Sequence, residues 1–150
     1  MNGWILAATV ALGAGAGATL WGVATGPLRR RVVAQNLSTA LACLVLLLLA
    51  QGYDRPSYVD LALVLALLGP VGTLVFARLL ADDLAEDPPR AWGPTYLVVG
   101  AGAAVVTALC VATGPSRASA KLLVVGALLI GGNVVASRAL SGGFSGLRRG

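Results

Sequence analysis

The chain has 150 residues, of which 57% are hydrophobic and only 11% charged, and its formal net charge is +5. Soluble domains carry roughly a quarter charged residues, so a soluble domain of this composition would leave much apolar surface facing water. The composition excludes an ordinary soluble domain and predicts a membrane protein. The basic excess does not indicate nucleic-acid binding, because no aromatic or basic stripe accompanies it.

Five apolar runs follow one another, at residues 3–25, 32–50, 58–77, 91–113 and 122–137. A helix needs about 20 residues to cross a bilayer, and open sheet edges cannot face lipid. We therefore expect an all-α integral membrane protein with about five transmembrane helices. The first run is expected to be a retained span rather than a secretory signal, because its apolar core is too long and no basic residue precedes Arg29.

The basic residues predict the orientation. If the five spans alternate, eight basic residues fall on one side and three on the other, and the richer side is assigned to the cytoplasm. The amino terminus is then outside and the carboxyl terminus cytoplasmic, in a multi-pass protein of the cell membrane. The richer side holds Arg29, Arg30, Arg31, Arg78, Arg90, Arg138, Arg148 and Arg149, and the other side holds Arg55, Arg117 and Lys121.

An acidic, proline-containing segment, residues 81–90, divides the chain. It carries four of the six acidic residues together with Pro88 and Pro89, which cannot continue a helix. We expect a cytoplasmic linker between a three-span region, residues 1–80, and a two-span region, residues 91–150. Its acidic cluster is more simply a solvated turn than a cation site.

Catalytic and metal chemistry have few candidates. The chain has no histidine, and Cys43 and Cys110 lie inside predicted spans without metal-ligand companions. Typical zinc sites and a Ser-His-Asp triad are therefore unavailable. We predict no enzyme, no metal and no cofactor.

Small residues within the spans predict close helix packing, because association in lipid relies on backbone approach. Gly13 and Gly17 form a GxxxG pair in the first run, and Gly69 and Gly72 lie in the third. Two interpretations are open, packing within this bundle and packing against other subunits, and the second is preferred.

Asp60 is the only acidic residue in or at a predicted span. A carboxylate at membrane depth is costly and is a functional candidate. At the first turn of a helix it also complements the helix dipole, and Ser57 three residues earlier fits an N-terminal cap. Capping and ion handling therefore both remain open for Asp60.

Other polar groups lie deeper in the spans. Asn36, Thr73 and Asn133 can each hydrogen-bond a neighbouring helix. Pro70 removes a backbone hydrogen bond in the middle of the third run. The carbonyl of Ala66 that it frees can line a small polar spot, as in broken transporter helices, although a plain shape-fitting kink is the simpler interpretation.

The stretches "GPLRRRVVAQN" and "YVDLALVLALLGPVGTLVFARLL" resemble the three-span MrpF family, one of the components of the Mrp-type multi-subunit sodium/proton antiporters. The resemblance covers residues 1 to about 80 and is most specific in the third span. Arg30 stands where the family usually has Asp, and Pro70 where it usually has an aromatic residue. The motif positions matched here are Gly26, Pro27, Arg31, Asn36, Asp60, Gly69, Gly72 and Arg78.

Residues 91–141 show a weaker similarity to the last two spans of the MrpG family, another component of the same antiporters. Lys121 enters the last span, and Arg138 and Ala139 leave it, as in that family. The first MrpG span has no counterpart, so the chain looks like an MrpF protein joined to a shortened MrpG protein.

The resemblance implies an accessory subunit of a large complex that exchanges cytoplasmic Na⁺ for external H⁺, with other membrane subunits as partners. It suggests that Asp60 and Asn36, with Pro70 and Thr73, lie at a subunit interface or line part of the cation path. Two other hypotheses stay open: a purely structural assembly subunit without ion contact, and a small homo-oligomeric exporter acting alone.

Overall fold

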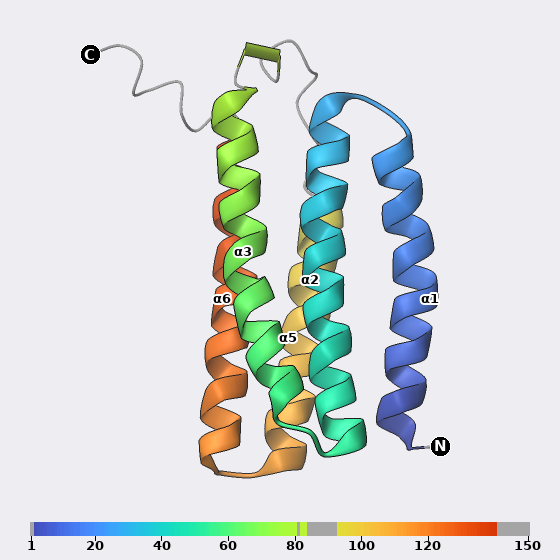
Figure 1. Ribbon diagram of the computed structural model, residues 1–150, viewed down its shortest axis with the longest axis vertical. Coiled ribbons are helices and arrows are strands. Elements are labelled where there is room, and N and C mark those ends of the chain that lie inside the picture. The colour runs from blue at the N-terminus through green and yellow to red at the C-terminus, as the bar shows by residue number, and fades with distance from the viewer. Residues whose placement is uncertain (1, 81, 84–92, 141–150) are drawn as a thin grey trace, which may run out of the picture.

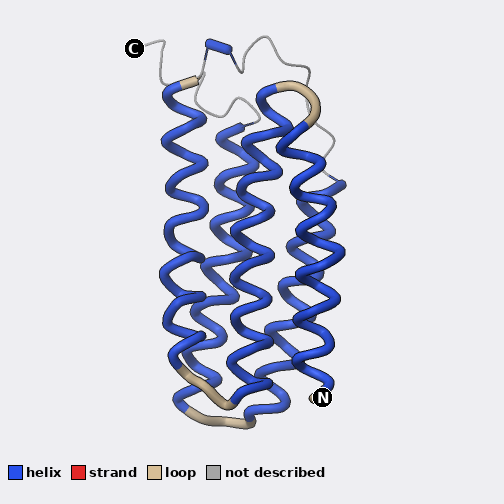
Figure 2. The backbone as a smooth tube through the Cα atoms, turned by 45° about the vertical axis from the view of Figure 1, so that its right-hand side comes forward, coloured by secondary structure: helices blue, strands red, loops and turns tan. Residues whose placement is uncertain are grey.

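The computed structural model describes residues 2–80, 82–83 and 93–140. Five long helices run up and down side by side (Figures 1 and 2). They are α1 (Gly3–Ala24), α2 (Leu28–Tyr53), α3 (Ser57–Leu79), α5 (Gly93–Thr113) and α6 (Arg117–Leu140). The all-helical prediction is confirmed, and α2 and α6 extend beyond the apolar runs at both ends.

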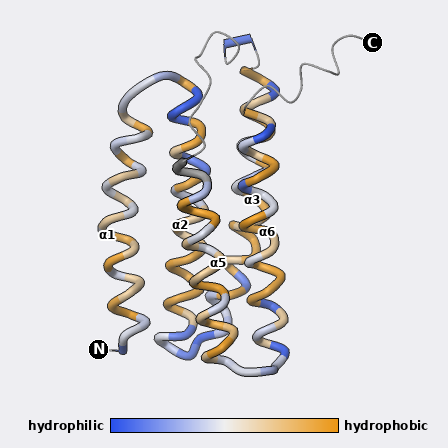
Figure 3. Tube along the Cα trace, turned by 180° about the vertical axis from the view of Figure 1, so that it is seen from behind, coloured by the Kyte–Doolittle hydropathy of each residue, from blue (hydrophilic) through white to orange (hydrophobic). Residues whose placement is uncertain are grey.

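All five helices are long and apolar enough to cross a membrane. Figure 3 shows hydrophobic residues along their length, with many of the hydrophilic positions near the helix ends. Large apolar side chains also point outward, which suits lipid and would be unfavourable in water. Among the most exposed of these are Leu20, Leu79, Leu97 and Val111.

Helix α2 is the centre of the bundle. It packs against α1 on one side and α3 on the other, and it also touches α5 and α6, while α6 packs against both α3 and α5. The core between α2, α5 and α6 includes Cys43, Leu47, Leu109 and Val125, all of them fully buried. Cys43 is thus a packing residue, and its thiol donates to the carbonyl of Ala62 at 3.4 Å.

A short turn brings α3 back along α2. Asp54 ends α2 in the left-handed conformation, with φ 52°, and its backbone N–H bonds to the carbonyl of Ala50. Asp is one of the few residues other than Gly that tolerates this conformation. The turn therefore needs only residues 54–56 before α3 begins at Ser57, and the two helices lie antiparallel.

The basic residues lie at the helix ends as the alternation predicts. Those at the start of α2, with Arg78 and Arg138 in the last turns of α3 and α6, share the end where α1 meets α2 (Figure 1). Arg55, Arg117 and Lys121 lie at the opposite end. Most of the linker 81–90, Arg90, Arg148 and Arg149 lie outside the described residues. Which end faces the cytoplasm remains a prediction.

Candidate functional site

A buried polar contact joins α2 to α6 inside the bundle, between the start of α2 and the last third of α6. Asn36 Nδ2 donates to Asn133 Oδ1 at 2.7 Å, and Asn133 Nδ2 donates to the carbonyl of Leu129 at 2.9 Å. Both asparagines are almost fully buried. The sequence identified each as an intramembrane polar group but gave no means of pairing two positions 97 residues apart.

Pro70 lies inside α3, which continues through it to Leu79. Its ring packs so closely on Gly132 of α6 that any side chain at Gly132 would collide with it. Thr73 is buried, and its hydroxyl donates to the carbonyl of Gly69 at 3.1 Å within the same helix. The predicted bond from Thr73 to a neighbouring helix is therefore replaced by a bond within α3.

Gly69 is also a contact point, this time between α3 and α2. A Cβ atom there would lie 2.9 Å from Thr39 Cγ2, which is closer than real Cβ contacts allow. The packing role predicted for Gly69 thus has a visible partner in the chain. Asn36, Gly69, Pro70 and Thr73 lie in one region where α2, α3 and α6 meet.

Asp60 lies apart from that region, in the first turn of α3. Its carboxylate pairs with the Lys121 ammonium of α6, with Nζ and Oδ1 separated by 3.0 Å, and the side chains of both residues are largely exposed. The cap predicted at Ser57 is wrong, because Ser57 is itself the first helical residue and the preceding Pro56 offers no side-chain hydrogen bond. The sequence places Lys121 at the start of the last span, but its pairing with Asp60 could not be predicted from the sequence.

The other predicted packing glycines have no neighbour in the described part of the chain. A Cβ atom at Gly13, Gly17 or Gly72 would meet nothing within 4 Å. The glycines of α1 that do contact α2 are Gly15, against Leu41, and Gly22, against Ala34. The GxxxG pair therefore faces away from this bundle, towards lipid or another protein.

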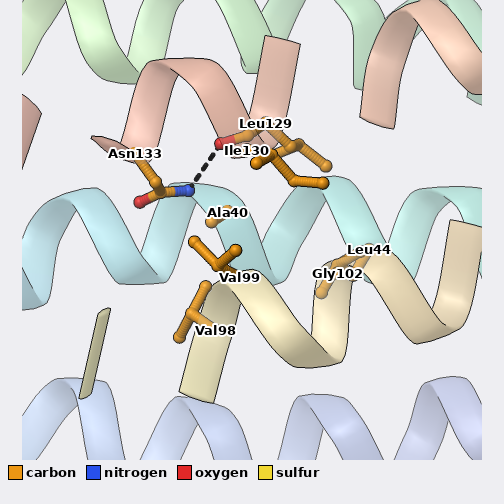
Figure 4. A pocket seen from close by; sticks show the side chains of 8 residues that line it. All are labelled: Ala40, Leu44, Val98, Val99, Gly102, Leu129, Ile130 and Asn133. Carbon is orange, nitrogen blue, oxygen red and sulfur yellow. Dashed lines mark hydrogen bonds between the residues drawn. The ribbon is translucent and has the colours of Figure 1, made fainter. Parts of the chain in front are cut away.

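Two small hollows adjoin Asn133. One opens between α2, α5 and α6 and is almost entirely apolar, with Asn133 and Ala40 beside the α5 residues Val98, Val99 and Gly102 (Figure 4). The other lies between α2, α3 and α6 and holds about 180 Å³ of empty space, counting its open mouth. Its lining includes Asn36, Thr39 and Asn133, so it is the more polar of the two hollows.

The arrangement offers neutral oxygen and amide groups rather than charged ones. Among the residues that the structure describes, no group of three His, Cys, Asp or Glu side chains is placed to hold a metal ion. Asn36, Asn133 and the threonines can orient water or contact a passing cation through oxygen atoms. They cannot supply a protonatable group.

Fold and polar contacts together define a small multi-pass membrane protein whose third helix is tied to its last. Residues 30–81 match the family model of Multiple resistance and pH regulation protein F (MrpF / PhaF). No curated protein and no solved structure matches the chain.

The match confirms the predicted resemblance to the MrpF family of the Mrp-type antiporters over this segment. It spans nearly all of α2 and all of α3, including Asn36, Asp60, Gly69 and Pro70. Helices α1, α5 and α6 lie outside it. The similarity of residues 91–141 to the MrpG family therefore remains a prediction.

Proposed function

We propose that this chain is an accessory membrane subunit of a multi-subunit Na⁺/H⁺ antiporter of the cell membrane. The observation that supports this most strongly is the match of residues 30–81 to protein F of the multiple resistance and pH regulation system. That segment forms α2 and α3, the two helices that carry Asn36, Asp60 and Pro70.

The role is accessory because the described spans offer too little ionisable chemistry for exchange. Asp60 is the only acidic residue within the five helices, it lies in a first turn, and it is paired with Lys121. Proton-coupled transport relies on protonatable groups inside the membrane. The exchange chemistry is accordingly assigned to partner subunits. Asp60, which is exposed at the helix end, is proposed to lie at a subunit interface or beside the cation path. Asn36, Pro70 and Thr73 are proposed to support that region from inside the bundle, where Asn36 and Thr73 are buried.

Residues 91–150 are proposed to act as a partner fused in the same chain, similar to a shortened MrpG protein. The support is that α6 supplies the partners of two residues in the matched segment, Asn133 for Asn36 and Lys121 for Asp60. The linker 81–90 then joins residues 1–80 and residues 91–150, two regions whose described side chains form these two contacts.

A purely structural role is the alternative. It is favoured by the Asp60–Lys121 pair, in which Lys121 already occupies one side of the carboxylate. It is also favoured by Gly13 and Gly17, which leave an open surface on α1 that suits another helix.

The test begins with extraction of the tagged chain from its native membrane in mild detergent. Several large multi-span partners should copurify, and vesicles containing the assembly should show Na⁺-dependent H⁺ exchange. Recovery of the chain alone would contradict the proposal. Exchange by the chain reconstituted by itself would contradict it too, and would identify a homo-oligomeric exporter.

Two variants separate the accessory roles within the assembly. Asp60→Asn should weaken exchange without loss of partners, whereas Asp54→Asn, in the turn outside the spans, should leave exchange intact. If Asp60→Asn is harmless and Gly13→Leu or Gly17→Leu removes the partners, the structural alternative holds. Gly131→Leu, at another open glycine, is the matched control for size.

A further inference from the structure

The oxygen of the Asn36 amide has no hydrogen-bond donor among the described residues, because this amide uses its Nδ2 to bond Asn133. Asn133 Nδ2 donates to the carbonyl of Leu129, so Asn133 Oδ1 faces α2 and accepts the hydrogen bond from Asn36 Nδ2. Asn36 Oδ1 is thereby turned towards α3, 3.8 Å from the position of a Cβ on Gly69. Asn36 is only 6% exposed, and no described donor bonds to this oxygen.

A second acceptor lies on the same side of α3. Pro70 has no N–H, so the carbonyl of Ala66, four residues earlier, lacks the donor that a helix normally supplies. Ala66, Pro70 and Asn36 all line the hollow between α2, α3 and α6. Polar acceptors that face a hollow inside the bundle are unfavourable unless a donor reaches them.

The hollow admits a water-sized sphere, which is the space that one buried water requires. We propose that it holds a single water molecule, which donates one hydrogen bond to Asn36 Oδ1 and one to the carbonyl of Ala66. This places a hydrated point inside the bundle at the junction of three helices. The inference depends on these contacts and not on the proposed antiporter role.

A neutral occupant fits better than a cation. The groups lining the hollow carry no formal charge, and the acidic residue nearest along α3, Asp60, lies six positions before Ala66, or about 9 Å along the axis at ~1.5 Å per residue. Asp60 is moreover already paired with Lys121. A cation in the hollow would remain uncompensated in a lipid environment, whereas water satisfies both acceptors without adding charge.

Hydroxyl radicals generated by X-rays oxidise side chains beside bound water, and the full chain in nanodiscs can be probed in this way by mass spectrometry. Leu65 and Leu129, which line the hollow, should be oxidised more readily than Leu68, which faces lipid. Equal oxidation of Leu65, Leu129 and Leu68 would overturn the proposal. With ¹⁸O-labelled water and rapid mixing, label at Leu65 should lag behind label at Tyr53, and equal timing would overturn it too.

A double variant removes the polar set and fills the space. Asn36→Leu with Asn133→Leu should abolish oxidation of Leu65 and Leu129, while Thr107→Val, which removes a hydroxyl from exposed α5 surface, should leave it unchanged. If the double variant fails to fold, the delayed ¹⁸O label in the native chain decides. Oxidation should be the same in choline chloride and in sodium chloride; loss of the signal with sodium would show a cation instead of water.

Discussion

Helices α1 and α2 are both apolar enough to span a membrane, yet they differ greatly in how much of each is buried inside the bundle. In the most apolar stretch of α2, 56% of residues are buried inside the bundle, against 6% in α1. Mean hydropathy differs much less, 2.1 for α2 and 1.5 for α1. Hydropathy therefore identifies helices that enter lipid, but it does not tell which of them other helices will cover.

The difference comes from how many neighbours each helix has. Helix α2 is covered by α1, α3, α5 and α6, whereas α1 packs mainly on α2. On α1 only Ala8 and Gly22 are buried. Its outer face, with Gly13 and Gly17, is therefore left uncovered by the described residues, whereas α2 has little surface left.

The largest expected effect on stability distinguishes a buried leucine of α2 from an exposed leucine of α1. Leu47→Ala on α2 removes a side chain that is 1% exposed, and leaving a cavity there should lower the free energy of unfolding by about 2–5 kcal/mol. Leu12→Ala on α1 removes one that is 52% exposed and should change it far less. Unfolding of both variants in mixed micelles measures the contrast; equal losses would mean that α2 is not the centre of the bundle.

Adjacent glycines on α6 give a second, smaller contrast. Gly132 lies against the ring of Pro70, while a Cβ at Gly131 would meet nothing within 4 Å. Gly132→Leu should therefore push α6 away from α3 and destabilise the chain by about 1–3 kcal/mol, as overpacking typically does. Gly131→Leu should be nearly neutral. If the two variants melt at the same temperature, the contact between α3 and α6 is looser than described.

The sequence could predict the number of spans and the positions of their polar residues, but not which helices lie against one another. Five spans, their alternation and the polar positions all follow from run length and composition, because lipid permits little besides helices. Pairing does not follow, since the sequence gives no distance between Asn36 and Asn133 or between Asp60 and Lys121. It also predicted a cap at Ser57, because a Ser three residues before an acidic residue fits that pattern whether or not the helix begins one residue earlier.

The Asn36–Asn133 contact should contribute a moderate amount to the free energy of unfolding. Asn36→Ala removes the bond to Asn133 Oδ1, which is then left buried without that donor. Interhelical hydrogen bonds in membranes average ~0.6 kcal/mol, with a maximum near 1.7, and the lost packing adds to this. Thr107→Ala on α5, whose hydroxyl bonds within its own helix, serves as the control. A loss no greater than that of Thr107→Ala would show that the asparagine pair does not hold α6 to α2.

The smallest expected effect concerns the ion pair between Asp60 and Lys121. The side chains of Lys121 and Asp60 are 58% and 61% exposed, so solvent screens them and the pair should contribute at most about 1 kcal/mol. Lys121→Gln should remove that contribution at low salt and have little effect at 1 M salt, where screening extends only ~3 Å. Arg117→Gln removes the same charge from the same end of α6. A salt dependence identical in the two variants would mean that Lys121 acts by its charge alone, and that α6 is held to α3 by Gly132 and Pro70.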